Sequence, residues 1–493
     1  MGINIIDIVK QSVKFTSINF FGKLMMIPKQ IIITLILGPA ELGIIGYIML
    51  WVMYANWITT GASASLPIEM PALLKTNQIK KALNLQYIAW SADFCIVIIV
   101  FIGLMIAAFF QSTALLRNLL IIGSFYYALQ KVAAYLHSMN WIRLNFSELA
   151  KIQLYITIIP TVLTFLFIYW LKIYALLVVP FITVIINIIL LLRIKSVGFE
   201  FRYDKKELFR LIRKGIVVTL ASIVFAAFVG VVDNTVISKY LSFDQLGIFI
   251  FSYTFMSMMS QGLKDFCDVF KPIFYGQLDT ESSDIDAFKG VKRMAIYFSI
   301  FSCIAMTFSQ IGFIVLVEKI TIKYSASKIV FMFLSTQIFL ETMGILPTLV
   351  LQSNRARKQI FVLIAMFLGL SLNIVLDIIV VKLGYGIVGI SVVTSATYGF
   401  ATILLYFFSR NYMTSSTKLF FLFILKLIIP FVFSILLTFM NWSILKYFDF
   451  WYFVGFALMV NLIVWLFLIL TFYSRYFSIS KLKSLKNILM KKA

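Results

Sequence analysis

The sequence is poor in charged residues, cysteine and histidine. Only 13% of its 493 residues are Asp, Glu, Lys or Arg, whereas soluble domains contain about 25%. A soluble enzyme is therefore excluded. The three cysteines, Cys95, Cys267 and Cys303, have no paired spacing, and His137 is the one histidine. These residues are too few for a disulfide framework or a zinc site, so we expect neither a metal nor another cofactor.

The sequence also lacks the motifs of ATP-driven transport and of catalysis. It contains no phosphate-binding loop of the form GxxxxGK[ST] and no polar stretch long enough for a nucleotide-binding domain. No Ser/His/Asp, Cys/His or CxxC arrangement supports nucleophilic or redox chemistry. We therefore expect that the protein is not an enzyme. A gradient, the membrane potential or a partner protein must supply its energy.

Apolar residues dominate what is present. They make up 62% of the chain, with 50 Phe, and the mean hydropathy is +1.00. At about 20 residues per membrane span, windows bounded by charge, Pro or Asn predict fourteen transmembrane helices. These spans fall at 13–37, 42–66, 86–110, 116–139, 149–171, 173–193, 215–239, 243–266, 291–317, 329–351, 359–381, 384–409, 418–440 and 450–473. The expected fold class is an all-α polytopic membrane protein.

The net charge of +23 indicates the orientation of such a protein. In a soluble protein it would suggest a nucleic-acid partner, but basic residues of membrane proteins gather in cytoplasmic loops. With a cytoplasmic N-terminus, 31 of the 43 basic residues fall in inside segments and eight in outside segments. We therefore expect both termini in the cytoplasm and no nucleic-acid partner.

An internal repeat organises the chain. Residues 10–44 align without a gap with residues 214–248, at an offset of 204 residues, and the triplet LGI begins at Leu42 and again at Leu246. Six spans precede a basic linker, and six follow it in the same in-out order. The sequence thus predicts two parallel six-helix halves related by a pseudo-twofold axis along the membrane normal, which is a transporter architecture.

The repeat gives the expected domain boundaries. They are an N-terminal six-helix bundle at 1–193, a basic cytoplasmic linker at 194–214, a C-terminal six-helix bundle at 215–409, two additional transmembrane helices at 410–474 and a basic cytoplasmic tail at 475–493. In transporters with parallel repeats the substrate binds between the halves near the midplane. The site should therefore lie on spans 1, 2, 7 and 8.

Polar residues at membrane depth on these spans predict a hydrated cavity. A lysine at mid-span costs about 2.5–3.5 kcal/mol on insertion scales, so it should face water or a partner. The residues expected to line a cationic cavity are Asn19, Lys23, Lys29, Gln30, Asn56, Gln261 and Lys264. An excess of positive charge suits an anion such as a diphosphate. Two alternatives to a cationic cavity remain. The lysines could extend to the membrane interface, and the hydroxyl-bearing residues could pack one helix against another.

Buried acids are candidates for ion coupling, because protonation or ion binding removes their burial cost. Three are singled out: Asp233, Glu341 and Asp377, the last two with Gln337 and Asn373 one turn earlier. Lys29 and Asp233 occupy equivalent repeat positions and could form a pair, which would serve either coupling or simple structural locking. Asp93 is expected to be a hydrogen-bonded structural acid instead.

Two segments resemble a known family. LILGPAELGIIGYIMLW at 35–51 is similar to its connection between the first two spans, and KLGYGIVGISVVTSATYG at 382–399 looks like its Gly-rich entry into span 12. The chain resembles the polysaccharide-transporter branch of the multidrug/oligosaccharidyl-lipid/polysaccharide exporter superfamily, and most closely the Wzx-type O-antigen flippases. Size, span count, duplicated halves and the basic linker extend the likeness over the whole chain.

The resemblance implies a function. Such flippases move an undecaprenyl-diphosphate-linked oligosaccharide across the bacterial inner membrane by alternating access. They hold the head group in a cationic cavity and the polyprenyl tail in a lateral groove toward spans 13 and 14. A glycan polymerase and a chain-length regulator are the implied protein partners. A cation-coupled drug exporter of the same superfamily and a membrane glycan polymerase are the alternatives, disfavoured by the lysines and by the short outside loops, respectively.

Overall fold

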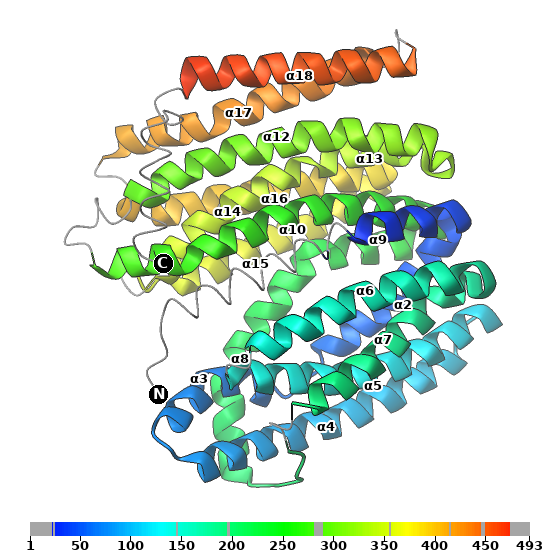
Figure 1. Ribbon diagram of the computed structural model, residues 1–493, viewed down its shortest axis with the longest axis vertical. Helices are drawn as coiled ribbons and strands as arrows, with labels where there is room; N and C mark the ends of the chain where they lie inside the picture. The colour runs from blue at the N-terminus through cyan, green and yellow to red at the C-terminus, as the bar shows by residue number, and fades with distance from the viewer. Residues whose placement is uncertain are drawn as a thin grey trace. The chain divides into compact units, whose positions relative to one another are not determined.

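The structure is a computed structural model that describes residues 22, 25–143, 146–194, 198–280, 289–353, 356–413, 416–444 and 449–473. Every regular element within these ranges is a helix (Figure 1), which confirms the all-α fold class. The chain divides into two compact units, one within Ser17–Ile250 and the other within Phe251–Ala493. The boundary falls inside a single long helix, α10.

The first unit contains the helices of the N-terminal part of the chain. They are an apolar helix at Met25–Ile36, α2 (Pro39–Trp57), α3 (Ala62–Lys75), α4 (Ile79–Phe109), α5 (Ala114–Ile142), α6 (Phe146–Leu171), the short η1 (Lys172–Tyr174), α7 (Ala175–Leu192), α8 (Lys205–Ala226), the π-helical turn η2 (Ala227–Val231), α9 (Val232–Tyr240) and the start of α10 (Phe243–Thr280).

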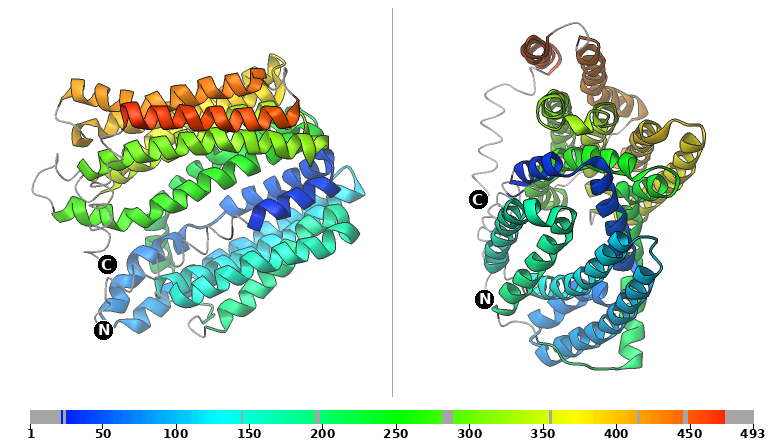
Figure 2. Two further views of the ribbon diagram at one scale, coloured as in Figure 1. Left: turned by 45° about the horizontal axis from the view of Figure 1, so that its top comes forward. Right: turned by 90° about the vertical axis from the view of Figure 1, so that its right-hand side faces the viewer.

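The second unit contains the remainder of α10 and the helices that follow it. They are α12 (Lys289–Lys319), the short η3 (Ile322–Tyr324), α13 (Ser327–Leu334), α14 (Thr336–Gln352), α15 (Gln359–Lys382), α16 (Gly386–Met413), α17 (Thr417–Ile444) and α18 (Phe450–Phe472). The two additional C-terminal helices, α17 and α18, pack against α12 and run alongside it (Figures 1 and 2).

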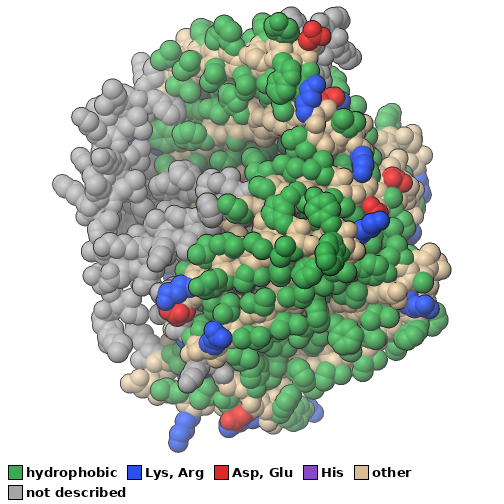
Figure 3. Space-filling model, turned by 45° about the vertical axis from the view of Figure 1, so that its right-hand side comes forward, with side chains coloured by type: hydrophobic (Ala, Val, Ile, Leu, Met, Phe, Trp, Pro, Cys, Tyr) green, Lys and Arg blue, Asp and Glu red, His purple; other side chains and the backbone are tan. Residues whose placement is uncertain are grey.

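The helices account for the predicted membrane spans. The thirteen predicted spans from 42–66 onward each coincide with a helix or with consecutive helices. Residues 13–21 of the first predicted span lie outside the described residues, and its remainder contains the helix Met25–Ile36. Ten described helices are long and apolar enough to cross a membrane. Large apolar side chains face outward; Trp170 is 87% exposed and Phe110 is 84% exposed. The face in Figure 3 is mostly hydrophobic, with few charged side chains. Such a surface needs lipid around it, so the protein is a multi-pass membrane protein.

Side-chain caps explain where several helices begin. Asp204 accepts hydrogen bonds from the backbone N–H groups of Lys206 (3.0 Å) and Glu207 (3.1 Å), so α8 starts ten residues before the predicted edge of span 7. Thr113 caps α5 in the same way. These caps satisfy N–H groups that the first turn of a helix leaves without partners.

Two predicted spans are interrupted. The span predicted at 42–66 consists of two helices, α2 and α3, joined by an extended turn in which Gly61 has a φ of +78°. The span predicted at 215–239 consists of α8, the π-helical turn and α9, and Gly230 in that turn has a φ of +80°. Positive φ is accessible to glycine because it has no Cβ. In transporters, interrupted helices expose backbone groups that bind ligands or ions.

The repeat is visible as a reciprocal contact between α2 and the start of α10. A Cβ on Gly43 would lie 1.8 Å from the carbonyl oxygen of Phe243, and a Cβ on Gly247 would lie 1.8 Å from that of Pro39. Gly43 and Gly247 are separated by the repeat offset of 204 residues, as are Pro39 and Phe243. The two LGI triplets therefore form a backbone contact that only glycine permits.

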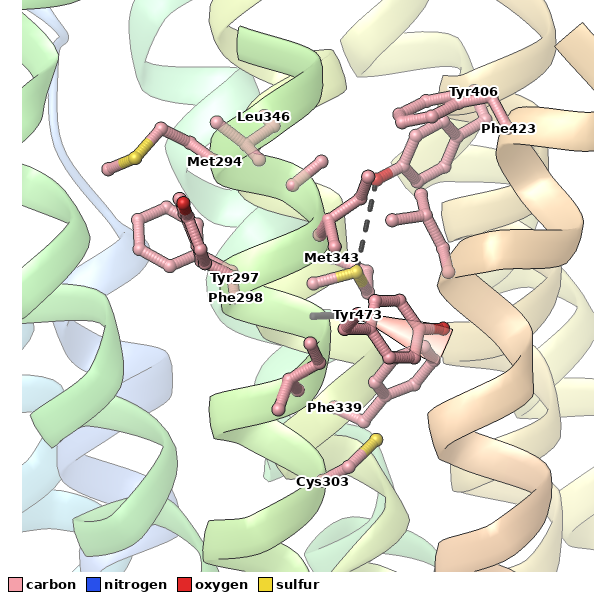
Figure 4. Packing of buried hydrophobic residues seen from close by; sticks show 14 of the residues in the cluster. Met294, Tyr297, Phe298, Cys303, Phe339, Met343, Leu346, Tyr406, Phe423 and Tyr473 are labelled. Atoms are coloured by element: carbon pink, nitrogen blue, oxygen red, sulfur yellow. Dashed lines mark hydrogen bonds between the residues drawn. The ribbon is translucent and has the colours of Figure 1, made fainter. Parts of the chain in front are cut away.

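The second unit has a continuous apolar core. Figure 4 shows Phe339 and Met343 of α14 packed with Cys303 of α12, Tyr406 of α16 and Tyr473. The polar groups of Trp465 and Tyr473 in this core have hydrogen-bond partners. The hydroxyl of Tyr473 donates to the carbonyl of Lys426 (2.6 Å), as expected where no water is present to bind them.

Candidate functional site

The break between α2 and α3 is closed by a carboxylate from α4. Oδ1 of Asp93 accepts hydrogen bonds from the hydroxyls of Thr59 (3.1 Å) and Thr60 (2.5 Å) and from the backbone N–H of Thr60 (3.3 Å). A negative charge is favourable at this point, because the N-terminus of α3 carries a partial positive charge. The expectation that Asp93 is a hydrogen-bonded structural acid agrees with these contacts.

A lysine from α5 caps the other side of the break. The ammonium of Lys131 donates a hydrogen bond to the main-chain carbonyl of Asn56 (2.8 Å), one of the carbonyls that the last turn of α2 leaves without a helical partner. Lysine at a helix C-terminus also complements the helix dipole. The side-chain amide of Asn56, a predicted cavity residue, donates to Gln130 Oε1 (3.2 Å), so α5 holds both its main chain and its side chain.

A cavity of about 200 Å³ with both apolar and polar lining residues lies beside this break, within the first unit. Both capping charges face it. The residues that line it are Ile58, Thr59, Ser63, Trp90, Asp93, Val97, Lys131, Ala134, Tyr135, Ser138 and Met139. Thr59 and Thr60 thus lie in the turn between the two helices, because α2 ends at Trp57.

The second unit contains a buried ion pair between two predicted site residues. Lys264 of α10 lies 2.5 Å from the carboxylate of Glu341 on α14, and only 4% of the Glu341 side chain is exposed. Ser260, one turn before Lys264, donates a hydrogen bond to the same carboxylate. Gln261, also predicted, is exposed and donates to Asp265 (2.9 Å). The structure therefore brings Lys264 together with Glu341 and leaves Gln261 beside them.

Gln337 lies one helical turn before Glu341 and is fully buried. Neither atom of its side-chain amide has a hydrogen-bond partner among the described residues. Asn373 on α15, one turn before the buried Asp377, is in the same state. Buried amides without partners are costly. Both amides neighbour an acid that the sequence singled out for ion coupling.

The remaining predicted residues have separate surroundings. Lys29 is half-buried, and its ammonium has no ion pair or hydrogen bond among the described residues; in particular, it does not pair with Asp233. Asp233 is fully buried in α9. Gln30 is half-buried and accepts a hydrogen bond from Thr34 at its main-chain carbonyl (3.0 Å). Asn19 and Lys23 lie outside the described residues.

A charge cluster at Glu69 was not expected from the sequence. This carboxylate on α3 is 10% exposed and lies 2.9 Å from both Arg210 and Lys214 of α8. Arg210 also bonds Glu207 (2.7 Å). Burial lowers the pKa of Arg210, but the hydrogen bonds and charges of Glu207 and Glu69 outweigh it and raise the pKa. The signal was present in the sequence, because Glu69 is the single acid in an apolar and hydroxyl-rich segment.

An apolar groove of about 560 Å³ also lies in the second unit, between α14, α16 and α17. Its lining includes Phe339, Met343, Gly399, Phe420 and Phe431. The groove is almost entirely apolar, unlike the cavity in the first unit.

Comparisons with known proteins agree with this architecture. A family model described as a polysaccharide biosynthesis protein matches residues 32–275. No curated protein sequence matches the chain. Among solved structures, the lipid II flippase MurJ in an inward closed conformation is similar, with 15% identity, a TM-score of 0.68, and coverage of 94% of this chain and 100% of that one.

Multidrug transporters of the MATE family are similar as well. An inward-facing member of the MOP superfamily shares 12% identity over 81% of this chain and 97% of its own, with a TM-score of 0.58. The Vibrio cholerae transporter VcmN in its bent form shares 13% identity over 85% of this chain and 98% of its own, with a TM-score of 0.52. These likenesses establish a shared fold.

Proposed function

Because the chain belongs to the polysaccharide-transporter branch of the multidrug/oligosaccharidyl-lipid/polysaccharide exporter superfamily, we propose that it is a lipid-linked glycan flippase. Its substrate is an undecaprenyl-diphosphate-linked repeat unit of an O-antigen, capsule or exopolysaccharide. The protein moves this unit across the bacterial inner membrane by alternating access, with both termini in the cytoplasm. A glycan polymerase and a chain-length regulator act on the product.

One observation carries the proposal: α14 contributes to both an apolar groove and a buried ion pair. Phe339 and Met343 line the groove of about 560 Å³, and Glu341 on the same helix holds Lys264. A ligand with a long apolar tail and an anionic head needs these two environments close together. The likeness of the fold to a lipid II flippase supports the same substrate class.

The ion pair suggests how the head group binds. A diphosphate that approaches Lys264 competes with Glu341 for the ammonium, as a point charge and not through the bidentate contact that arginine makes. Once separated from Lys264, the Glu341 carboxylate would remain buried without a counter-charge, which is strongly unfavourable. Uptake of a proton or a cation relieves this cost. Substrate binding and ion binding are thereby linked.

The other acids extend this coupling. Asp233 on α9 and Asp377 on α15 are fully buried, and Asn373 lies one turn from Asp377. We propose ion coupling at Asp233, Glu341 and Asp377. We also propose contacts with the diphosphate-sugar head group for the lysines and polar residues that the sequence predicts: Lys23, Lys29, Lys264, Asn19, Gln30, Asn56 and Gln261. Ion binding that stabilises one of the two conformations of alternating access would return the transporter to its starting conformation after release of the glycan.

Complementation tests the function. The gene is deleted in its host, and the wild type, Lys23→Ala, Lys264→Met and Glu341→Gln are reintroduced at equal protein level. We expect the deletion to abolish surface glycan and to leave the lipid-linked repeat unit in the cytoplasmic leaflet, and we expect both lysine variants to fail to restore display. Lys239→Met, at the exposed end of α9, is the matched control and should restore it.

A different result would overturn the proposal. If complete repeat units reach the outer leaflet of the deletion strain and stay unpolymerised, the protein is a polymerase. A second function, cation-coupled drug export, is favoured by the likeness of the fold to MATE transporters. Sensitivity to cationic dyes distinguishes the two functions. If the protein is a drug exporter, the deletion strain is hypersensitive to the dyes and its surface glycan stays normal.

A further inference from the structure

The cavity beside the break between α2 and α3 contains two opposite charges that do not form an ion pair. Asp93 and Lys131 both line it, yet their hydrogen bonds go to Thr59, Thr60 and Asn56 and not to each other. Each charge is anchored to a different end of the interrupted span, Asp93 at the start of α3 and Lys131 at the end of α2. The helix ends therefore hold the charges apart and keep the space between them open.

Both charged groups retain unused hydrogen-bonding capacity. Three donors share Oδ1 of Asp93, whereas Oδ2 accepts no hydrogen bond from the described residues. An ammonium has three donors, and Lys131 uses one of them on Asn56. A strong acceptor and a strong donor thus face the same cavity. Hydroxyls of Thr59, Ser63 and Ser138 lie around them.

An aromatic wall completes the lining. The rings of Trp90 and Tyr135 pack together with centroids 4.3 Å apart, and both residues line the cavity. Gln86 donates a hydrogen bond to the Tyr135 hydroxyl (2.8 Å), which fixes this ring in place. Rigid aromatic groups beside a few convergent polar groups are typical of small-molecule sites.

The chemistry selects among ligand classes. A metal cation is disfavoured because Lys131 would repel it, and a diphosphate is disfavoured because Asp93 would. A sugar hydroxyl both donates and accepts, so two adjacent hydroxyls satisfy the Asp93 carboxylate and the Lys131 ammonium at once, while the C–H face of the ring packs on the aromatic wall. A water-sized group needs roughly 15 Å³, so 200 Å³ admits on the order of a dozen such groups, about the size of one hexose.

We propose that this cavity binds one neutral sugar residue, a hexose or N-acetylhexosamine, of the transported glycan. The inference rests on the proposed flippase function and adds the part of the substrate recognised by the first unit. Asp93 and Lys131 contact the hydroxyls directly. Thr59 and Thr60 are positioning residues, because their bonds to Oδ1 direct the other carboxylate oxygen toward the sugar.

Protection of an introduced cysteine tests the site in the full-length protein. Ser138, in the cavity lining, is changed to Cys. The background variant is Cys95→Ala, which keeps the two buried cysteines. The rate of labelling by a small charged thiosulfonate is then measured with and without glucose, galactose or N-acetylglucosamine. At a concentration ten times its Kd, a bound sugar should slow labelling about tenfold. Ser242→Cys, exposed before α10, should label at an unchanged rate.

The charged residues give a second readout. Asp93→Asn and Lys131→Met, each combined with Ser138→Cys, should abolish protection while the proteins stay monodisperse with cooperative thermal unfolding. Protection that is absent from the parent Ser138→Cys protein for all three sugars overturns the proposal, whether or not these two variants fold. Protection by Na⁺ alone also overturns it and makes the cavity a cation site. If the protein flips the lipid-linked glycan but sugars do not protect the Ser138→Cys thiol from labelling, only the sugar site is refuted. If sugars protect this thiol but the protein does not flip the glycan, only the flippase function is refuted.

Discussion

Gly43 and Gly247 lie at equivalent positions of the repeat, and each packs against the backbone of the other's helix. The carbonyl oxygens of Phe243 and Pro39 occupy the places where their Cβ atoms would be. The two copies of the repeat thus meet at a point where neither glycine tolerates a side chain.

A side chain at either glycine should prevent this contact. We expect Gly43→Val and Gly247→Val to destabilise the protein by about 1–3 kcal/mol or more, because overpacking forces the backbones apart. Thermal unfolding in detergent measures the effect. Gly103→Ala in α4, where nothing lies within 4 Å of the added Cβ, is the control and should leave stability unchanged or raise it. Equal melting temperatures for all three variants would contradict the contact.

The Lys264–Glu341 ion pair allows stability to be separated from transport. Lys264→Met alone leaves the Glu341 carboxylate buried without its partner, which costs about 3–5 kcal/mol. The double variant Lys264→Met/Glu341→Gln removes both charges, so we expect it to recover most of the lost stability but not glycan display. If the double variant restores display as well, the pair is only structural.

The ion pairs of Glu69 with Arg210 and Lys214 should stabilise the packing of α3 against α8. We expect Glu69→Gln to lower stability by about 1 kcal/mol for each of the two partially exposed basic partners, Arg210 and Lys214. The loss should shrink at high salt, because exposed charge pairs are screened. Glu207→Gln is the control, since Glu207 contacts Arg210 but not α3. A loss of the same size in both variants would place the effect in α8 alone.

Gln310 should join three segments of the second unit. Its amide donates to the hydroxyl of Ser335 (2.6 Å), and its carbonyl accepts from Thr438 of α17 (2.7 Å). Interhelical hydrogen bonds in membranes contribute about 0.6 kcal/mol each and up to about 1.7, so we expect Gln310→Leu to cost about 1–3 kcal/mol in thermal unfolding. Ser371→Ala, which removes a bond within α15 only, is the control. Indistinguishable unfolding of the two variants would contradict the bridge.

The helices could be predicted because lipid imposes a simple rule. A span needs about 20 apolar residues, and the windows found on that basis coincide with helices throughout the described chain. The fold class follows from it. The break between α2 and α3 could not be predicted, because Ile58, Thr59 and Thr60 are all compatible with a helix. The local cue is Gly61, and its positive φ is apparent only from the structure.

The candidate sites could be predicted only in part. Lys264 and Glu341 were singled out because isolated charges are costly in a membrane, but their pairing depends on how α10 and α14 pack. Lys29 and Asp233 could pair by repeat equivalence, but that equivalence fixes only the position of a residue in its helix and not the contacts of its side chain. The roles of Asp93 and Lys131 depend on helix ends that the hydropathy pattern does not locate.

The charges of these sites come in opposite pairs, Asp93 with Lys131 in one unit and Lys264 with Glu341 in the other. An elementary charge that crosses the membrane potential changes the free energy by about 2.3 kcal/mol per 100 mV. Two opposite charges that travel together on one rigid body contribute equal and opposite electrical work. If the proposed alternating access moves each pair as one body, the four residues transfer almost no net charge in the empty protein, and any voltage dependence comes from the substrate or from charges outside these pairs.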